Sequence, residues 1–126
     1  MSGLICVDTF GWLERLLDGP LADEYNRVLS SVRPAEVVTS VVTVYEVYRK
    51  LRPVRGEVVA LEAIVHLKAT TIVPVDEELA LEAADYSLTH SLHFSDALVY
   101  ATARRYDAPL HTSDPDLKSV PGVVFH

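Results

Sequence analysis

The stretch HFSDALVYATARRYDAPLHTSDPDLKSVPGVVF, residues 93–125, decides the fold of this chain. Its residue pattern predicts four elements in order: a helix that opens on Ser95-Asp96, a strand at Leu110–Thr112, an acidic turn over residues 113–116 and an apolar strand at Val123–Phe125. Asp96 lies in the first turn of the helix, and Asp114 follows the carboxyl end of a strand. Ligands of open α/β sheets bind outside the carboxyl ends of the strands, and two carboxylates meeting there favour a cation. The stretch therefore predicts an acidic site at one edge of a sheet.

The rest of the chain alternates predicted strands and helices. Short apolar runs at residues 4–7, 36–39 and 71–75 are typical of buried parallel strands. Apolar residues at helical spacing predict the intervening helices, which lie at residues 9–18, 20–31, 41–51, 57–68 and 76–90, with a connector at 53–56. The resulting order is β-α-α-β-α-α-β-α-α-β, followed by a short helix and a last strand. This alternation predicts an α/β protein, a three-layer α/β/α sandwich with a central, mostly parallel sheet.

The composition indicates one globular domain. The chain has 126 residues, of which 49% are hydrophobic, so we expect residues 1–126 to form a single domain with one core. No apolar run approaches the ~20 residues that span a bilayer, and the first ten residues lack the basic region and cleavage site of a signal peptide. We therefore expect a cytoplasmic protein with no membrane partner. The lone Cys6 has no second cysteine with which to form a disulfide or a zinc site.

The balance of charges is acidic. The formal net charge of −7 argues against a generic nucleic-acid binder, because such proteins are usually basic. This objection weakens if several of the acids share bound metal ions. The mean hydropathy of +0.19 is high for so small a domain, and it indicates apolar surface that a partner covers.

Two further acids follow predicted strands, and each has a structural alternative: Asp8 lies at the end of the first strand, and Glu46 lies in the helix after the second. Asp8 ends the first strand and is either a metal ligand or a helix N-cap. Residues 41–51 are rich in β-branched side chains, which favour strands, but their apolar residues recur at helical spacing and indicate a helix. Glu46 lies off this apolar stripe. Its carboxylate is therefore available either for the acidic site or for an i, i+4 pair with Lys50.

The chain has two further groups of charged residues, an acidic run at residues 76–78 and a basic cluster. Residues 76–78, an Asp-Glu-Glu run, open a predicted helix and suit the positive end of its dipole, so we expect them to be structural. Basic residues gather at the end of the helix predicted over residues 41–51. They form either a solvated helix end or an edge that contacts phosphate. These residues are Arg49, Lys50, Arg52 and Arg55.

Taken together, these motifs resemble the PIN-domain ribonucleases, and most closely the VapC-type toxins of prokaryotic toxin–antitoxin pairs. The resemblance covers essentially the whole chain. It is carried by four blocks: VDTFGWLE (residues 7–14), TSVVTVYEVYRKL (39–51), HFSDALVYATARRYDAPLHTSD (93–114) and DLKSVPGVVF (116–125). The resemblance implies that four acids form a site for Mg²⁺ or Mn²⁺, namely Asp8, Glu46, Asp96 and Asp114.

The resemblance also implies supporting residues. Asp116 matches a further acid that many family members carry and that we assign to the metal site, and Thr112 matches a hydroxyl residue near a strand end. One departure is Phe10, which stands where many relatives carry a small hydroxyl residue. Thr9 is then the nearest residue that can supply a hydroxyl group.

The resemblance implies an endoribonuclease, the toxin of a toxin–antitoxin pair, that hydrolyses RNA phosphodiester bonds with a metal-activated water. Hard divalent cations prefer oxygen ligands, and they lower the pKa of bound water so that it is nucleophilic near neutral pH. The resemblance also points to a cognate antitoxin and a homodimer. The apolar composition favours both, as do Tyr25, Tyr45 and Tyr48 on the early helices. The basic cluster would line the RNA path or contact an acidic segment of the antitoxin.

Two alternatives remain open from the residues alone. A receiver-like acidic metal-binding domain would need paired acids after the first strand and a lysine after the last. Asp76 does follow a strand, but Asp8 has no acidic neighbour and no lysine follows Val123–Phe125. A non-catalytic PIN-like binding module would use the acids only as helix caps. The five histidines, of which His93 lies nearest the acids in sequence, lack the spacing of a metal-binding motif.

Overall fold

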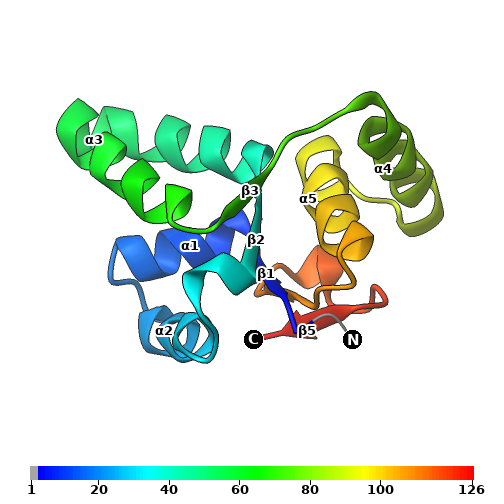
Figure 1. The fold of residues 1–126 in the computed structure, drawn as a ribbon, viewed down its shortest axis with the longest axis horizontal. Coiled ribbons are helices and arrows are strands. Elements are labelled where there is room, and N and C mark those ends of the chain that lie inside the picture. Colours follow the sequence, from blue (N-terminus) through cyan, green and yellow to red (C-terminus); the bar gives the residue numbers. More distant parts are fainter. Residues whose placement is uncertain (1–2) are drawn as a thin grey trace.

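The computed structural model describes residues 3–126 and shows a sheet between two groups of helices (Figure 1). Its elements, in chain order, are β1 (Ile5–Val7), α1 (Thr9–Leu16), α2 (Ala22–Ser30), the 3₁₀ helix η1 (Pro34–Glu36), β2 (Val37–Ser40), α3 (Val41–Lys68), β3 (Thr71–Val73), α4 (Glu77–His90), α5 (Phe94–Arg105), β4 (Leu110–Thr112), the 3₁₀ helix η2 (Pro115–Leu117) and β5 (Val123–Phe125). No helix within the described residues combines the length and the apolar composition that crossing a membrane requires.

The sheet has five strands in the order β3-β2-β1-β4-β5, and every neighbouring pair is parallel. In register, Cys6 of β1 lies between Val38 of β2 and Leu110 of β4. Parallel neighbours need crossover connections, which the helices supply. The predicted α/β/α sandwich is confirmed, and its sheet is parallel throughout.

Alternating side chains of β1 build the two apolar layers. Ile5 and Val7 are buried against residues of α1, α2 and α3, whereas Cys6 is buried with residues of α4 and α5 on the opposite face. Figure 1 shows the same division, with α1, α2 and α3 on one side of the sheet and α4 and α5 on the other. Because helices cover both faces of the central strands, β1 and β2 are buried along their whole length.

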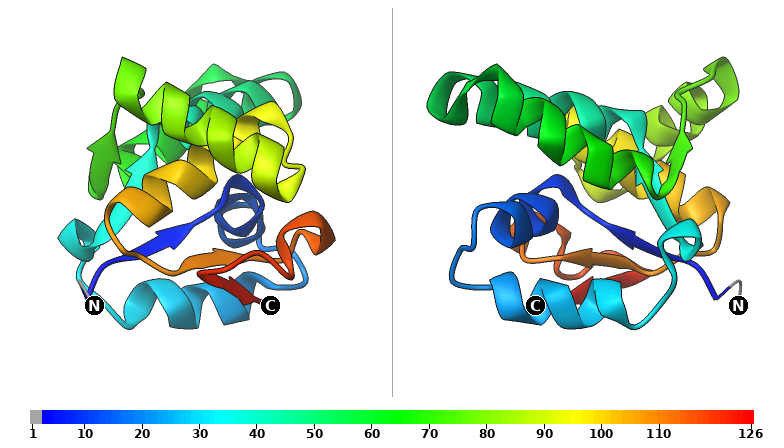
Figure 2. Two further views of the ribbon diagram at one scale, coloured as in Figure 1. Left: turned by 90° about the vertical axis from the view of Figure 1, so that its right-hand side faces the viewer. Right: turned by 60° about the vertical axis from the view of Figure 1, so that its left-hand side comes forward.

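The central strand β1 marks the point where the strand order reverses. The next strand in the chain, β2, lies on one side of β1, and β4 lies on its other side, with β5 beyond it (Figure 2). Such a reversal opens a crevice at the carboxyl ends of the diverging strands, where open α/β proteins bind ligands. Asp8 follows β1 directly, and Asp114 lies two residues beyond β4. The topology therefore brings these two acids to one crevice.

Some predicted boundaries were wrong for local reasons. The predicted connector at residues 53–56 is helical except at Gly56, whose φ of 86° and ψ of 170° divide α3 into two helical segments. Glycine adopts positive φ without steric cost, so the break falls there and not at Pro53. The third strand ends at Val73, because Pro74 has no N–H group for the sheet ladder. The helix α2 also begins two residues later than predicted.

Candidate active site

Four carboxylates line one pocket at the carboxyl edge of the sheet. The pocket has a volume of about 270 Å³ and is lined by Asp8, Glu46, Asp96 and Asp114 together with Thr9, Phe10, Val99, Ser113, Pro115 and Leu117. The four acids come from the β1–α1 junction, from α3, from α5 and from the turn after β4. Within the described residues, no lysine, arginine or histidine lines this pocket. The pocket therefore concentrates negative charge without a protein cation to balance it.

Asp8 is the most deeply buried of the four acids, with 8% of its surface exposed. It caps α1, because its Oδ1 atom accepts a hydrogen bond of 2.8 Å from the backbone N–H of Gly11. Its Oδ2 atom accepts a hydrogen bond from the hydroxyl of Thr112, the last residue of β4. Burial outweighs these two hydrogen bonds and, with the negative charges of Asp96 and Asp114, raises the pKa of Asp8 to about 6. Asp8 is thus a helix cap that also lines the pocket.

Thr9 and Glu46 connect α1 to α3. The Thr9 hydroxyl donates to Oε1 of Glu46 at 2.6 Å, and it lies 3.4 Å from the hydroxyl of Thr43. Among the described residues, no ion pair joins Glu46 to Lys50, which was the structural alternative. Thr43 was not predicted as a neighbour of the site. Its place three residues before Glu46 was the available signal, because residues at this spacing share a helix face.

Asp96 and Asp114 influence each other across the pocket. Asp96 lies in the first turn of α5 and is partly buried; burial raises its pKa, and the carboxylates of Asp114 and Glu46 raise it further. Asp114 is held by its own turn: its backbone N–H donates to Oγ1 of Thr112 at 3.0 Å, and its Oδ1 atom accepts from the backbone N–H of Asp116 at 2.9 Å. The carboxylates of Asp114 and Glu46 are therefore near enough to disfavour the ionised form of Asp96.

Asp116 and Ser113, both in the turn after β4, differ in whether they line the pocket. Asp116, which we expected at the metal site, is exposed and is not one of the residues that line the pocket. Ser113 does line it, and its Oγ atom lies 2.6 Å from the phenol oxygen of Tyr25 in α2. Ser113 was not predicted, because a serine in a polar turn carries no signal that distinguishes it from other turn residues.

The basic cluster lies beside the acidic pocket and not in it. Arg49 and Lys50 line a neighbouring hollow, which shares three lining residues with the pocket. Arg52 forms an exposed ion pair of 3.2 Å with Glu57. Arg55 is exposed and immediately precedes the break within α3.

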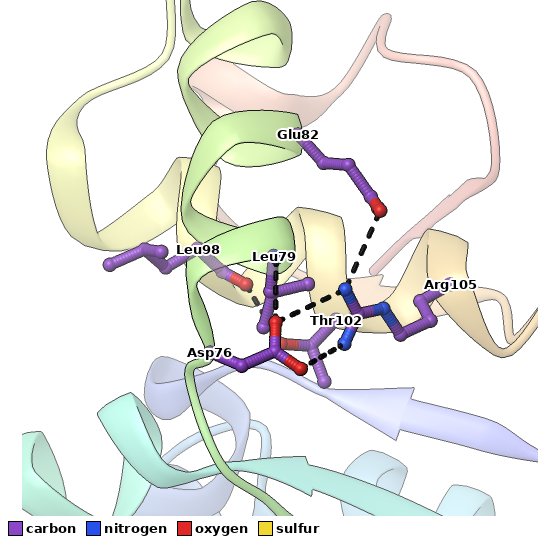
Figure 3. Close-up of polar contacts among 6 residues, drawn as sticks. All are labelled: Asp76, Leu79, Glu82, Leu98, Thr102 and Arg105. Carbon is purple, nitrogen blue, oxygen red and sulfur yellow. Dashed lines mark hydrogen bonds and ion pairs between the residues drawn. The ribbon is translucent and has the colours of Figure 1, made fainter.

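A second group of acids is built around Arg105 (Figure 3). Asp76 caps α4, because its Oδ1 atom accepts a hydrogen bond of 2.8 Å from the backbone N–H of Leu79. Arg105 of α5 pairs with Asp76 at 3.2 Å and with Glu82 at 3.4 Å. The hydrogen bond from Leu79, and then that from Arg105, lowers the pKa of Asp76. These acids cap a helix and pair with a cation, in keeping with the structural role expected for Asp76.

The acidic pocket offers the donor atoms that a hard divalent cation prefers. Its carboxylates supply oxygen ligands, and the raised pKa values of Asp8 and Asp96 indicate that a cation would favour their ionised forms. In the described part of the chain, no three Asp, Glu, His or Cys side chains are grouped closely enough to hold an ion by themselves. Mg²⁺ typically uses one or two carboxylates and keeps several waters. The donor set therefore fits such an ion, and the pocket is a candidate metal-dependent active site.

Comparison with protein families gives the class to which this fold and site belong. The family model of the PIN domain matches residues 5–123, a range that includes all four acids. The chain therefore belongs to the PIN-domain family, and the resemblance inferred from the sequence is confirmed. No curated protein sequence gives a significant match to the chain.

Solved structures share the fold over nearly the whole chain. A toxin–antitoxin complex from Klebsiella pneumoniae matches with a TM-score of 0.80 and 23% identity over 95% of each chain. VapC20 of Mycobacterium tuberculosis, a sarcin–ricin loop cleaving toxin, matches at 0.78 and 22% identity over 93% of this chain and 95% of that one. VapBC2 from Rickettsia felis, bound to a DNA fragment from its promoter, matches at 0.76 and 14% identity over 98% and 97%. The fold is therefore that of VapC-type PIN domains.

Proposed function

We propose that this PIN-domain protein is the toxin of a toxin–antitoxin pair and acts as an endoribonuclease that depends on Mg²⁺ or Mn²⁺. The observation that carries the proposal is the pocket whose lining, among the described residues, holds four carboxylates and no lysine, arginine or histidine. The likeness to VapC20, a toxin that cleaves the sarcin–ricin loop, supports RNA as the substrate. In this proposal residues 1–126 act as one domain in the cytoplasm.

The acids of the pocket would hold the ion, and the chain's hydroxyl groups would hold the acids. The candidate ligands are Asp8, Glu46, Asp96 and Asp114, with Asp116 at the pocket's edge. When bound, a divalent ion supplies a nucleophilic water near neutral pH and neutralises charge on the scissile phosphate. Thr112 donates to the Asp8 carboxylate, and Thr9 donates to that of Glu46. These hydrogen bonds orient the oxygen atoms that would face the ion.

We further propose a cognate antitoxin and a homodimer. The similar structures include a toxin–antitoxin complex, which supports the antitoxin. An apolar groove of about 430 Å³ runs between α4 and α5, and two of its lining residues, Leu88 and Phe94, are 84% and 82% exposed. Large exposed apolar side chains favour burial by a protein surface, and a second copy of the chain would bury them in a symmetric contact. Light scattering at tens of micromolar should show a dimer, and a monomer would contradict this part of the proposal.

Cleavage assays test the nuclease. Purified protein should cut RNA internally with Mg²⁺ or Mn²⁺, lose this activity in EDTA and regain it when metal is restored, because the acids alone supply no cation for the phosphate. Sequencing RNA ends after controlled expression, beside an Asp96→Asn control, would identify the cleaved bond. Equal cleavage in EDTA and in Mg²⁺ would overturn the metal-dependent mechanism.

A further inference from the structure

We propose that the face beside the acidic pocket is a subsite that stacks an unpaired base of a single-stranded RNA and binds the adjoining phosphates. This stacking face consists of Phe10, Tyr45, Tyr48, Arg49, Lys50 and Arg52. The inference rests on the proposed nuclease function, and it adds a binding site that selects unpaired strands over duplexes.

The stacking face continues directly from the acidic pocket. A hollow of about 400 Å³ adjoins the pocket and shares Thr9, Phe10 and Glu46 with it. A third hollow, of about 370 Å³, shares Tyr45 and Arg49 with the second. The three hollows therefore adjoin one another along the N-terminal half of α3, over about two helical turns, or about 11 Å. A strand that enters the pocket can continue along this row of hollows.

Two aromatic rings of the stacking face are open to solvent. Phe10 is 46% exposed and Tyr45 is 63% exposed, whereas Trp12 and Tyr25 of the neighbouring core are 2% and 0% exposed. Aromatic rings in such grooves stack on nucleic-acid bases without sequence preference, because every base has a π-face. Phe10 also lines the acidic pocket. A base stacked on it would belong to a nucleotide adjoining the scissile phosphate.

Cations on the stacking face complement a phosphate backbone. Arg49 and Lys50 are exposed, and among the described residues neither forms an ion pair. Arg52 donates to the phenol oxygen of Tyr48 at 3.2 Å and pairs with Glu57 at 3.2 Å. Exposed ion pairs of this kind contribute little stability, so Arg52 can release the carboxylate of Glu57 and bind a phosphate group instead. The cations lie where a strand leaves the acids, so they offset the repulsion of a chain with a net charge of −7.

The combination of rings and cations favours a single strand over a duplex or a protein segment. A duplex hides the faces of its bases within the stack, whereas an unpaired strand presents them to aromatic side chains. An apolar protein segment would find a better match in the groove between α4 and α5, which is lined mainly by alanine, leucine and phenylalanine. The charge and shape of the stacking face thus point to unpaired RNA.

RNA affinity in an Asp96→Asn background, with Mg²⁺ present, tests the subsite separately from cleavage. By fluorescence anisotropy, Tyr45→Ala and Phe10→Ala should each weaken binding of a short unstructured RNA about 5- to 100-fold, which is the cost of losing one base–aromatic stack. Tyr45→Phe restores the ring and should recover the affinity that Tyr45→Ala loses. Arg49→Ala should weaken binding and reduce its salt dependence. Arg27→Ala, which removes an exposed arginine of α2 outside the face, should do neither.

RNAs with a single abasic nucleotide locate the stacked base. When the abasic nucleotide lies at the position that would stack on Tyr45, the RNA should bind the parent and Tyr45→Ala equally, because neither complex then contains the base–tyrosine stack. Duplex RNA should likewise bind the two proteins with equal affinity. Equal affinity of Tyr45→Ala and its parent for the intact single strand would overturn the subsite and leave this face to a protein partner. If the expected differences in RNA affinity are found but the wild-type protein never cleaves RNA, only the proposed nuclease function is overturned.

Discussion

Two groups of acids in this protein contain an aspartate with the same local role, but the groups that face the two aspartates differ. Asp8 follows β1 and caps α1, and Asp76 lies between β3 and α4 and caps α4. Each carboxylate accepts a hydrogen bond of 2.8 Å from the backbone N–H three residues further along the chain, from Gly11 and Leu79 respectively. The local chemistry is therefore the same in both places, namely an aspartate that caps a helix after a strand.

The groups differ in what else faces the carboxylate. Asp76 pairs with Arg105 (Figure 3), and its pKa is lowered. Asp8 faces Thr112 and other carboxylates in the acidic pocket, and its pKa is raised to about 6. An acid that has a protein cation is balanced within the fold. Acids gathered without one need an external cation to stay ionised together, and this is what distinguishes a candidate metal site from a structural cluster.

The largest expected difference between the two groups is in catalysis. Asp96→Asn should reduce RNA cleavage more than 100-fold, because losing a metal ligand should exceed the about 10–100-fold cost of losing a group that only orients a ligand. Asp76→Asn keeps a cap of similar quality and should leave cleavage unchanged. Initial rates at saturating Mg²⁺ measure both. If the two variants lose activity equally, the acids of the pocket act through the fold and not on the reaction.

The next effect is on stability. A metal that binds only the folded state stabilises it by RT ln(1 + [L]/Kd), about 2.7 kcal/mol at a hundredfold excess over Kd, which raises the melting temperature by several degrees. Asp96→Asn should melt higher than wild type in EDTA, because it relieves carboxylate repulsion, and should gain less from Mn²⁺. Asp76→Asn should gain as much as wild type. Equal metal increments in wild type and Asp96→Asn would remove Asp96 from the metal site.

A smaller effect separates two buried hydroxyl groups. Thr112 donates to the Asp8 carboxylate, and Thr102 donates to the backbone carbonyl of Leu98 within α5 at 2.9 Å (Figure 3). Thr102→Val should cost stability of about 1 kcal/mol, because it removes one buried hydrogen bond. Thr112→Val should cost more, because it also removes the hydrogen bond that Thr112 accepts from the backbone N–H of Asp114. Only Thr112→Val should also slow cleavage, by about 10–100-fold. Rate losses of the same size in both variants would mean that the Thr112 hydroxyl matters only to folding.

A further effect is on the pH dependence of stability without metal. The pKa of Asp8 rises from 3.8 to about 6 on folding. Its contribution to stability is therefore fully present below pH 3.8 and is lost as the pH rises through about 6. The lowered pKa of Asp76 acts in the opposite direction, so its contribution is present above pH 3.8 and is lost as the pH falls through its folded pKa. Urea unfolding in EDTA should show Asp8→Asn gaining on wild type between pH 4 and 7, and parallel profiles would contradict the raised pKa.

Much of the fold was predictable because its signals are local. Apolar runs marked the strands, and helical spacing identified residues 41–51 as helix despite their β-branched side chains, as α3 confirms. Helix boundaries were less predictable where two helix-breaking residues lie close together in the sequence. Pro53 and Gly56 both favour a break, and which of them ends a helical segment depends on the backbone conformation that the surrounding packing permits.

The candidate site was predictable in part. Element ends located Asp8, Asp96 and Asp114, and Glu46 was open between the acidic site and a pair with Lys50. The family resemblance then joined all four in one metal site. Thr43 and Ser113 were not predicted, because their relation to the acids arises only when α1, α2, α3 and the turn after β4 pack together. Asp116 matched the family pattern, yet the structure places its side chain outside the pocket lining.

The sequence by itself determined the order of the elements and which acids lie at strand ends and helix starts, since both depend on neighbours along the chain. It did not determine which groups would face the carboxylates of Asp8 and Asp76. Arg105 lies 29 residues from Asp76, and Thr112 lies 104 residues from Asp8. Contacts across such separations depend on how helices and strands pack. Only the tertiary structure therefore decided which aspartate is balanced by an arginine and which shares a pocket with other acids.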